Sequence, residues 1–392
     1  MEACTALEFQ WPYLLKLVGD QADIEKLAVE AGALRRRRGI RSASDLLRVA
    51  LAYGLCDLSL RQTAAWAEAN DIASLSDVAL LKRLRTGDAW LGQVLGRMLA
   101  DQVGRRRLDE SRWRLRLVDA TCVSKPGSTG TDWRIHLGWE LGSAGIDSIE
   151  LTDDKGGESL ERFSIAPGEL AIADRGYAHR AGMWSVMLSG GDFIVRLNWQ
   201  NVPLRDRDGS PFDLLAALRG MPEAQAAEFP VEVAEGPKSP AFDARLAAIR
   251  KTEAAAEKSR QRILKEASKK GKSVDPRTLE AAAYVFVLTS LLPEHATATE
   301  VLELYRLRWQ VELAFKRMKG VLFLDELPAK EPHLARTFLY AKLIGALLLD
   351  RYTETYLGFS PWGFPLGAAV PVETAPGVPG RHEAGRRPGA TS

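Results

Sequence analysis

Hydrophobic residues in the first quarter of the chain recur at a helical period. Apolar positions three and four residues apart predict a helix that begins after Ser42 or Ser44. Two further helices are predicted over residues 59–70 and 76–85, and Gly87 marks the end of the second of these. We therefore expect residues 1–108 to form a helical domain.

From Trp113 the hydrophobic pattern changes to a period of two, which predicts β-strands. Asp119 ends the first predicted strand and Asp174 ends the fourth. This order of elements resembles an α/β ribonuclease H-like core with a mixed five-stranded sheet, in which the first and fourth strands are neighbours. The two aspartates should then meet at the carboxyl edge of the sheet. The strands are expected over residues 113–119, 133–141, 146–151, 170–174 and 193–197, with helices over 157–163 and 178–188.

The rest of the chain predicts an insertion, a return to the core and a tail. Residues 201–283 contain turns, two candidate strands and a charged helix, and we expect them to form an insertion domain between the core segments 109–200 and 284–356. Residues 357–392 are expected to be a disordered tail, because the 34 residues from Phe359 contain six Pro and six Gly.

The segment from Tyr305 to Lys319 predicts one continuous helix with two different faces. At about 100° per residue, Tyr305, Arg308, Glu312 and Lys319 fall within about 60° of one another. Apolar residues form a separate stripe that can hold the helix to a core. On this segment alone, an ordinary amphipathic helix with a surface ion pair between Arg308 and Glu312 is the favoured explanation. The two aspartates that end strands favour a functional site.

Charge is distributed unevenly, although the formal net charge is only +2. From Asp119 to Asp174 the chain carries eleven Asp or Glu against four Lys or Arg. From Arg245 to Lys272 it carries ten Lys or Arg against three Glu. An acidic centre with basic flanks is typical of a cation site beside a polyanion.

The two helices over residues 59–70 and 76–85 resemble a helix-turn-helix. Arg83 and Arg85 lie on the second of them, and a run of four arginines lies upstream at residues 35–38. We expect this region to contact DNA. A solvated basic surface on a helical bundle is the alternative.

Composition places the chain among globular proteins, with 46% hydrophobic and 27% charged residues. No apolar run approaches the length of a membrane span, and the first residues lack the features of a secretory signal. Cys4, Cys56 and Cys122 are odd in number and widely spaced, so they indicate neither a disulfide framework nor a zinc site. The cytoplasm is the expected compartment.

Three carboxylates, those of Asp119, Asp174 and Glu312, would repel one another if they converged without a cation. Magnesium resolves this conflict because it prefers a few hard oxygen ligands and keeps positions open for water and phosphate. Two ions about 3.5–4 Å apart would serve an in-line phosphoryl displacement. Arg308, Lys319 and Arg175 are expected to neutralise nearby phosphates, and the Tyr305 hydroxyl to donate to another.

The spacing Tyr305-x2-Arg308-x3-Glu312-x6-Lys319 resembles the Y-R-E-K signature of the DDE transposases of bacterial insertion sequences, in the insertion-sequence family numbered four. The sequences around Asp119 and around Ala173-Asp174-Arg-Gly-Tyr177 resemble that family's first two acidic motifs. The resemblance covers about residues 35–355.

The resemblance implies cut-and-paste transposition by DDE two-metal chemistry. Asp119, Asp174 and Glu312 would bind two Mg²⁺ ions, with Mn²⁺ as a substitute, and Tyr305, Arg308 and Lys319 would hold DNA. The partners implied are double-stranded DNA, both terminal inverted repeats and target, and a second copy of the chain in a homodimeric synaptic complex. No membrane is implied, and the location would be the bacterial cytoplasm at the nucleoid.

Two departures from the family pattern leave alternatives open. Some relatives carry a Trp at the start of the strand before the helix, where this chain offers Tyr284 or Phe286. Relatives also continue into a structured C-terminal region, where this chain has its Gly/Pro-rich tail. The alternatives are therefore a silent or truncated transposase that acts as a DNA-binding repressor, or a related ribonuclease H-like endonuclease.

Overall fold

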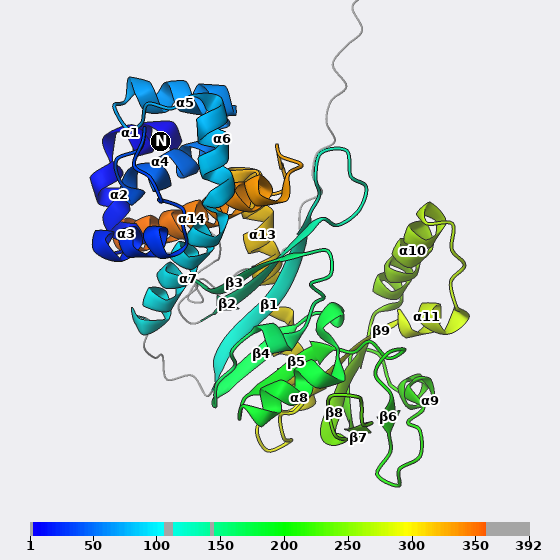
Figure 1. Cartoon of the computed structure of the whole chain (residues 1–392). Coiled ribbons are helices and arrows are strands. Elements are labelled where there is room, and N and C mark those ends of the chain that lie inside the picture. The colour runs from blue at the N-terminus through cyan, green and yellow to red at the C-terminus, as the bar shows by residue number, and fades with distance from the viewer. Residues whose placement is uncertain (1–2, 106–112, 142–144, 358–392) are drawn as a thin grey trace, which may run out of the picture.

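One large mixed sheet organises the molecule (Figure 1). The computed structural model describes residues 3–105, 113–141 and 145–357. Within them the strands follow the order β3-β2-β1-β4-β5-β9-β8-β7-β6. Their bounds are Arg114–Val123 (β1), Trp133–Glu140 (β2), Gly145–Asp153 (β3), Glu169–Ala173 (β4), Asp192–Arg196 (β5), Leu204–Arg205 (β6), Ala226–Val233 (β7), Phe242–Arg250 (β8) and Tyr284–Thr289 (β9).

The five expected strands are present as β1 to β5, but the sheet does not stop at five. β9 pairs with β5, and β8, β7 and β6 follow it, so the strands of the expected insertion extend the same sheet. A second difference concerns Asp119, which does not end its strand. β1 continues to Val123, because its last residues still pair with β2 after its pairing with β4 stops at Val118.

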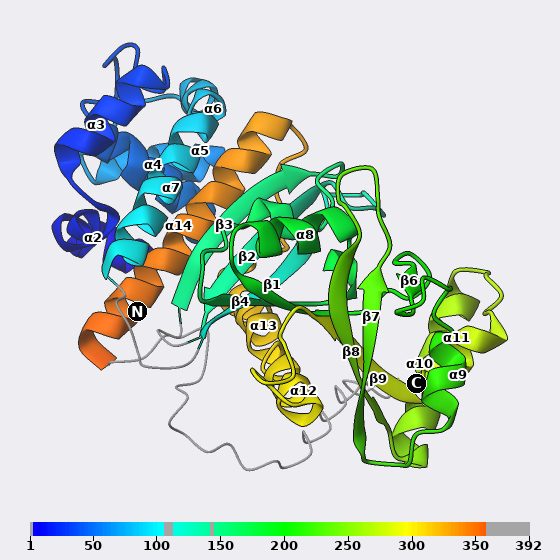
Figure 2. The same ribbon diagram turned by 90° about the horizontal axis from the view of Figure 1, so that it is seen from below.

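Hydrophobic side chains cover both faces of the sheet. On one face Leu117 and Ile172 share a core with the N-terminal helices and α12, α13 and α14. On the other face Val118 and Ala173 pack with α8 (Figure 2). This division follows from the alternation of side chains along a strand. The helices over these faces and at the far end are α8 (Arg180–Leu188), α9 (Leu214–Arg219), α10 (Glu253–Lys269), α11 (Pro276–Ala281), α12 (Ala298–Arg306), α13 (Trp309–Leu322) and α14 (Pro332–Leu357), with 3-10 turns η1 (Leu160–Arg162) and η2 (Arg175–Tyr177).

The N-terminal region is helical, as the sequence predicts. Ser42, Ser59 and Ser76 each accept a backbone hydrogen bond at the start of a helix, which fixes where α4, α5 and α6 begin. The long C-terminal helix α14 lies against α4, with Gly54 and Gly345 at the closest approach. The helices are α1 (Ala3–Phe9), α2 (Trp11–Val18), α3 (Gln21–Glu30), α4 (Ala43–Leu55), α5 (Leu60–Ala69), α6 (Asp77–Thr86) and α7 (Asp88–Arg105).

The predicted continuous helix over residues 305–319 is wrong in one respect. The chain forms two helices, α12 and α13, with a break at Leu307 and Arg308. Amides at the break bond three residues back, as in Leu307 N–H to Leu304 O at 3.0 Å and Arg308 N–H to Tyr305 O at 3.1 Å. This tighter turn changes the angular spacing between Tyr305 and the residues of α13.

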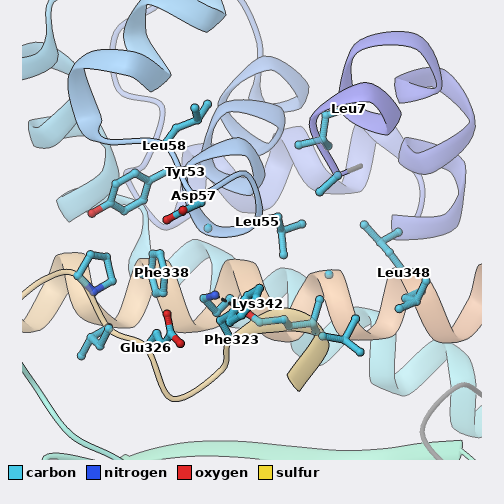
Figure 3. A pocket seen from close by; sticks show the side chains of 18 of the residues that line it. Leu7, Tyr53, Leu55, Asp57, Leu58, Phe323, Glu326, Phe338, Lys342 and Leu348 are labelled. Carbon is cyan, nitrogen blue, oxygen red and sulfur yellow. Dashed lines mark hydrogen bonds between the residues drawn. The ribbon is translucent and has the colours of Figure 1, made fainter. Parts of the chain in front are cut away.

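A cavity of about 1050 Å³ lies between α1, α4, α14 and the segment that follows α13 (Figure 3). Leu7, Leu55 and Leu348 contribute to its apolar wall. Lys342 reaches into it from α14, where its ammonium donates to the Leu322 carbonyl and lies 4.7 Å from the centre of the Phe338 ring. No helix in the described part of the chain is long and apolar enough to cross a membrane.

The tail expected over residues 357–392 lies outside the described residues from residue 358 onward.

Candidate active site

Asp119 and Asp174 lie side by side on adjacent strands. β1 and β4 run parallel, with Val118 opposite Ala173, so the next residue on each chain is an aspartate. Asp119 Oδ1 accepts a hydrogen bond from the Ala120 amide at 2.8 Å. Burial, together with the charges of Glu312 and Asp174, raises the pKa of Asp119 to about 7, against the opposing effects of the Ala120 amide and Arg308. The sheet therefore concentrates negative charge at this point.

Tyr305 and Arg308 border the two aspartates from the α12–α13 break. The Tyr305 hydroxyl donates to Asp174 Oδ1 at 3.3 Å, and the Arg308 guanidinium lies 5.7 Å from the centre of the Tyr305 ring. Burial, together with the charge of Asp174, raises the pKa of Tyr305 to about 12. The phenol therefore stays protonated and keeps its role as a donor at neutral pH.

Glu312 faces Arg308 rather than the aspartates. Arg308 Nη2 donates to Glu312 Oε1 at 2.5 Å, and the Glu312 side chain is 53% exposed. Glu312 is near enough to affect the pKa of Asp119. No group of three His, Cys, Asp or Glu side chains within the described ranges is arranged to hold a metal ion. The three carboxylates are thus neighbours that do not converge, because Glu312 is bound to a cation on its own helix.

Arg308 has unused hydrogen-bonding capacity in a nearly buried position. Its side chain is 14% exposed, and within the described residues its Nε and Nη1 atoms have no hydrogen-bond partner. Burial lowers the pKa of Arg308, but Tyr305, Asp174 and Glu312 outweigh burial and leave the pKa above its usual value. A permanently charged guanidinium with two unpaired nitrogens is suited to an anion.

Comparison with known proteins identifies the family. The model of the transposase DDE domain matches residues 113–349, a range that contains Asp119, Asp174 and Glu312. The chain belongs to the DDE transposase family. The putative transposase InsL of insertion sequence element IS186A, from Escherichia coli K12, is 41% identical over 355 residues, which cover 90% of this chain and 96% of that protein. The transposase of insertion sequence element IS421 from Escherichia coli is 40% identical over 356 residues, with the same coverage of both chains.

Among solved structures, a piggyBac transposase synaptic complex with hairpin DNA aligns with 90% of this chain and 80% of its own, at 8% identity and a TM-score of 0.39. That likeness is too weak to carry an inference. The family assignment rests on the domain match and on the two insertion-sequence relatives.

Lys319 and Arg175 are the two other cations that the sequence predicts to contact phosphates. Lys319 is on α13, about two turns beyond Glu312, and is partly exposed. Arg175 follows Asp174 directly, and its Nη2 donates to Asn198 Oδ1 at 3.3 Å. Burial and Arg196 lower the pKa of Arg175, although Asp174 opposes them.

The predicted DNA-contacting arginines of α6 form contacts inside the protein. Arg83 donates to the backbone carbonyls of Arg36 and Arg38, so it holds the arginine run against the helix. Arg85 forms an ion pair with Glu331 at 3.2 Å. Lys82, on the same helix, is exposed.

Neither aromatic candidate for stacking on a base is presented at the surface. Tyr284 is 7% exposed and Phe286 is 8% exposed, and both pack in the core on the α8 side of the sheet. The sequence reasoning also missed Arg196, the last residue of β5, which is exposed beside this site. The available signal was that the predicted strand containing Arg196 follows, in the sequence, the predicted strand that ends in Asp174.

Proposed function

We propose that this chain is a transposase that cleaves DNA at the ends of an insertion sequence and joins those ends to target DNA. The observation that carries the proposal is the arrangement of two adjacent aspartates, a neighbouring glutamate and the underused Arg308 guanidinium. Its position within the matched DDE domain supports the same conclusion. Double-stranded DNA is the substrate, both as terminal inverted repeats and as target.

The residues present fit a divalent metal. Asp119, Asp174 and Glu312 offer only carboxylate oxygens, the ligands that Mg²⁺ prefers. Burial, and to a smaller extent the charges of Glu312 and Asp174, raise the pKa of Asp119, and a bound cation would offset both effects. Glu312 would join the aspartates after its side chain leaves Arg308. When bound, two Mg²⁺ ions, or Mn²⁺ in their place, supply activation of the attacking oxygen and stabilisation of the leaving oxygen.

The protein's own residues prepare the substrate for that chemistry. Arg308 holds a phosphate near the scissile bond with its unpaired Nε and Nη1 atoms. Tyr305 orients Asp174 through its hydroxyl. Lys319 and Arg175 contact flanking phosphates, which fixes the strand in line for attack. Once an incoming phosphate engages Arg308, Glu312 is free to turn toward the aspartates.

We infer a ribonuclease H-like core built on β1 to β5, for which the order β3-β2-β1-β4-β5 is the support. Residues 109–200 and 284–356 supply this core, and residues 201–283 are inserted between them. The helical residues 1–108 bind the inverted repeats, with Arg83, Arg85 and the arginine run near the DNA. A homodimer bridges two element ends, so that both ends are processed in one complex.

The test is cleavage of inverted-repeat DNA with Mg²⁺ by the wild type and by Glu312→Gln. We expect wild-type cleavage and joining, and loss of both in Glu312→Gln and after removal of divalent metal. Glu303→Gln is the matched control, because Glu303 is an exposed glutamate on α12. Equal activity of Glu312→Gln and wild type would remove Glu312 from the site. Binding of the ends without cleavage by the wild type would favour a DNA-binding repressor.

A further inference from the structure

The carboxyl edge of the sheet carries charges of both signs in a fixed order. β1, β4 and β5 run parallel, and β8 runs in the same direction because β5 and β8 are both antiparallel to β9. The carboxyl ends of four strands therefore meet at one edge. Asp119 and Asp174 occupy the β1 and β4 positions, Arg196 ends β5, and Lys251 directly follows β8. Carboxylates thus lie at the β1 and β4 positions of this edge, and cations lie at the β5 and β8 positions.

Three cations along this edge form no ion pair with any residue that the structure describes. Arg196 is exposed and forms no ion pair with any described residue. The Lys251 ammonium donates to Ser259 Oγ at 3.0 Å and to the Ala282 carbonyl at 2.7 Å, both of them neutral. Arg175 donates to the neutral amide oxygen of Asn198.

The three cations also lie close enough to affect one another. Ala173 lies opposite Val195 in the pairing of β4 with β5, which brings Arg175 close to Arg196. Burial lowers the pKa of Lys251, and the nearby charge of Arg196 lowers it further. Like charges gathered in this way cost folding energy unless an anion joins them.

We propose that Arg175, Arg196 and Lys251 form a binding site for a DNA phosphate one step along the strand from the phosphate held at the aspartates. This binding site rests on the proposed function, and it adds the direction in which the bound DNA strand runs. α10 begins immediately after Lys251, with Thr252 as its N-cap, and it belongs to the segment with ten basic and three acidic residues. The bound strand therefore leaves the aspartates across β5 and β8 toward α10.

Arg196→Ala tests the site with little risk to folding, because the Arg196 side chain is exposed and forms no ion pair among the described residues. Affinity is measured by titration of labelled duplex without divalent metal, so that the readout is independent of cleavage. We expect a several-fold loss of affinity and a fall of about one in the slope of log affinity against log salt. Arg196→Lys should recover most of both. Arg207→Ala, an exposed arginine in the loop after the far edge strand β6, is the matched control and should behave as wild type.

Uncharged methylphosphonates then locate the phosphate. Each phosphate of an element-end duplex, and separately of a target duplex offered to the preassembled complex, is replaced in turn. We expect one position at which substitution weakens the wild type but leaves Arg196→Ala unchanged, and the duplex that contains it identifies the source. Equal sensitivity of the two proteins at every position, or equal losses for Arg196→Ala and Arg207→Ala, would overturn the site while leaving binding and cleavage by the wild type intact. Failure of the wild type to bind or cleave element ends would instead count against the proposed function.

Discussion

The hydroxyl of Tyr305 donates to Oδ1 of Asp174 at 3.3 Å, across 131 residues of sequence. This contact joins the last turn of α12 to the end of β4. It fixes the α12–α13 break against the sheet edge, and with it the position of Arg308 beside the aspartates.

Tyr305→Phe removes that hydroxyl and keeps the ring beside Arg308. The lost hydrogen bond contributes about 1 kcal/mol, which corresponds to about a fivefold lower cleavage rate if the bond orients Asp174 during the reaction. Unfolding in urea should change by no more than about 1 kcal/mol. Cleavage of inverted-repeat DNA under single-turnover conditions measures the effect. An unchanged rate would show that the contact does not act in the reaction.

Arg245 should be essential for the position of α12. Its guanidinium is 7% exposed and donates to the carbonyls of Leu291, Leu292 and Ala296 in the segment between β9 and α12, at 2.6, 3.2 and 2.7 Å, and to Glu228 at 2.6 Å. Arg245→Leu leaves these buried carbonyls without their donor, and we expect a loss of about 3–5 kcal/mol in urea unfolding. Glu228→Gln should lose no more than about 1 kcal/mol, because Glu228 is 39% exposed. Similar losses of stability for the two variants would show that the bonds from Arg245 to these carbonyls do not hold the segment before α12.

The contact between α4 and α14 requires glycine at position 54. A Cβ atom there would lie 2.6 Å from the Cβ of Ala341 on α14. Gly54→Ala should therefore destabilise the protein by about 1–3 kcal/mol through overpacking. Gly96 on α7 is the matched control, since nothing lies within 4 Å of its Cβ position and Gly96→Ala should stabilise by about 0.5–1 kcal/mol. Thermal unfolding measures both, and a change of the same sign in both variants would contradict the steric explanation.

Lys342 should make the free energy of unfolding depend on pH in the alkaline range. Burial lowers its pKa from the ordinary value of 10.5 to about 8, against the opposing charges of Glu326, Asp57 and Asp325. Between these two values the unfolded chain binds more protons at this group than the folded protein does, so its contribution to stability rises with pH. The gain is fully absent below about pH 8 and reaches about 3 kcal/mol near pH 10.5.

The measurement is urea unfolding of wild type and Lys342→Met across that pH range. The difference between the two proteins isolates Lys342 from other groups that titrate there. We expect wild type to gain stability relative to the variant as pH rises. A constant difference from pH 7 to pH 10.5 would mean that the ammonium remains charged inside the fold.

The local elements could be predicted from the sequence because their causes are local. Serine caps and helical spacing placed α4, α5 and α6, and alternation placed β1 to β5. The adjacency of Asp119 and Asp174 followed from one assumption about strand order, and the register of Val118 with Ala173 confirms it.

Only the tertiary structure decided which groups face one another. It added the four strands β6, β7, β8 and β9 to the sheet. It also broke the helix at Leu307 and Arg308, and it turned Glu312 toward Arg308. It also brought Arg196 and Lys251 to the edge that carries the aspartates. Pairing between distant strands and the choice of side-chain rotamer depend on contacts far apart in sequence, and periodicity along the chain contains no information about them.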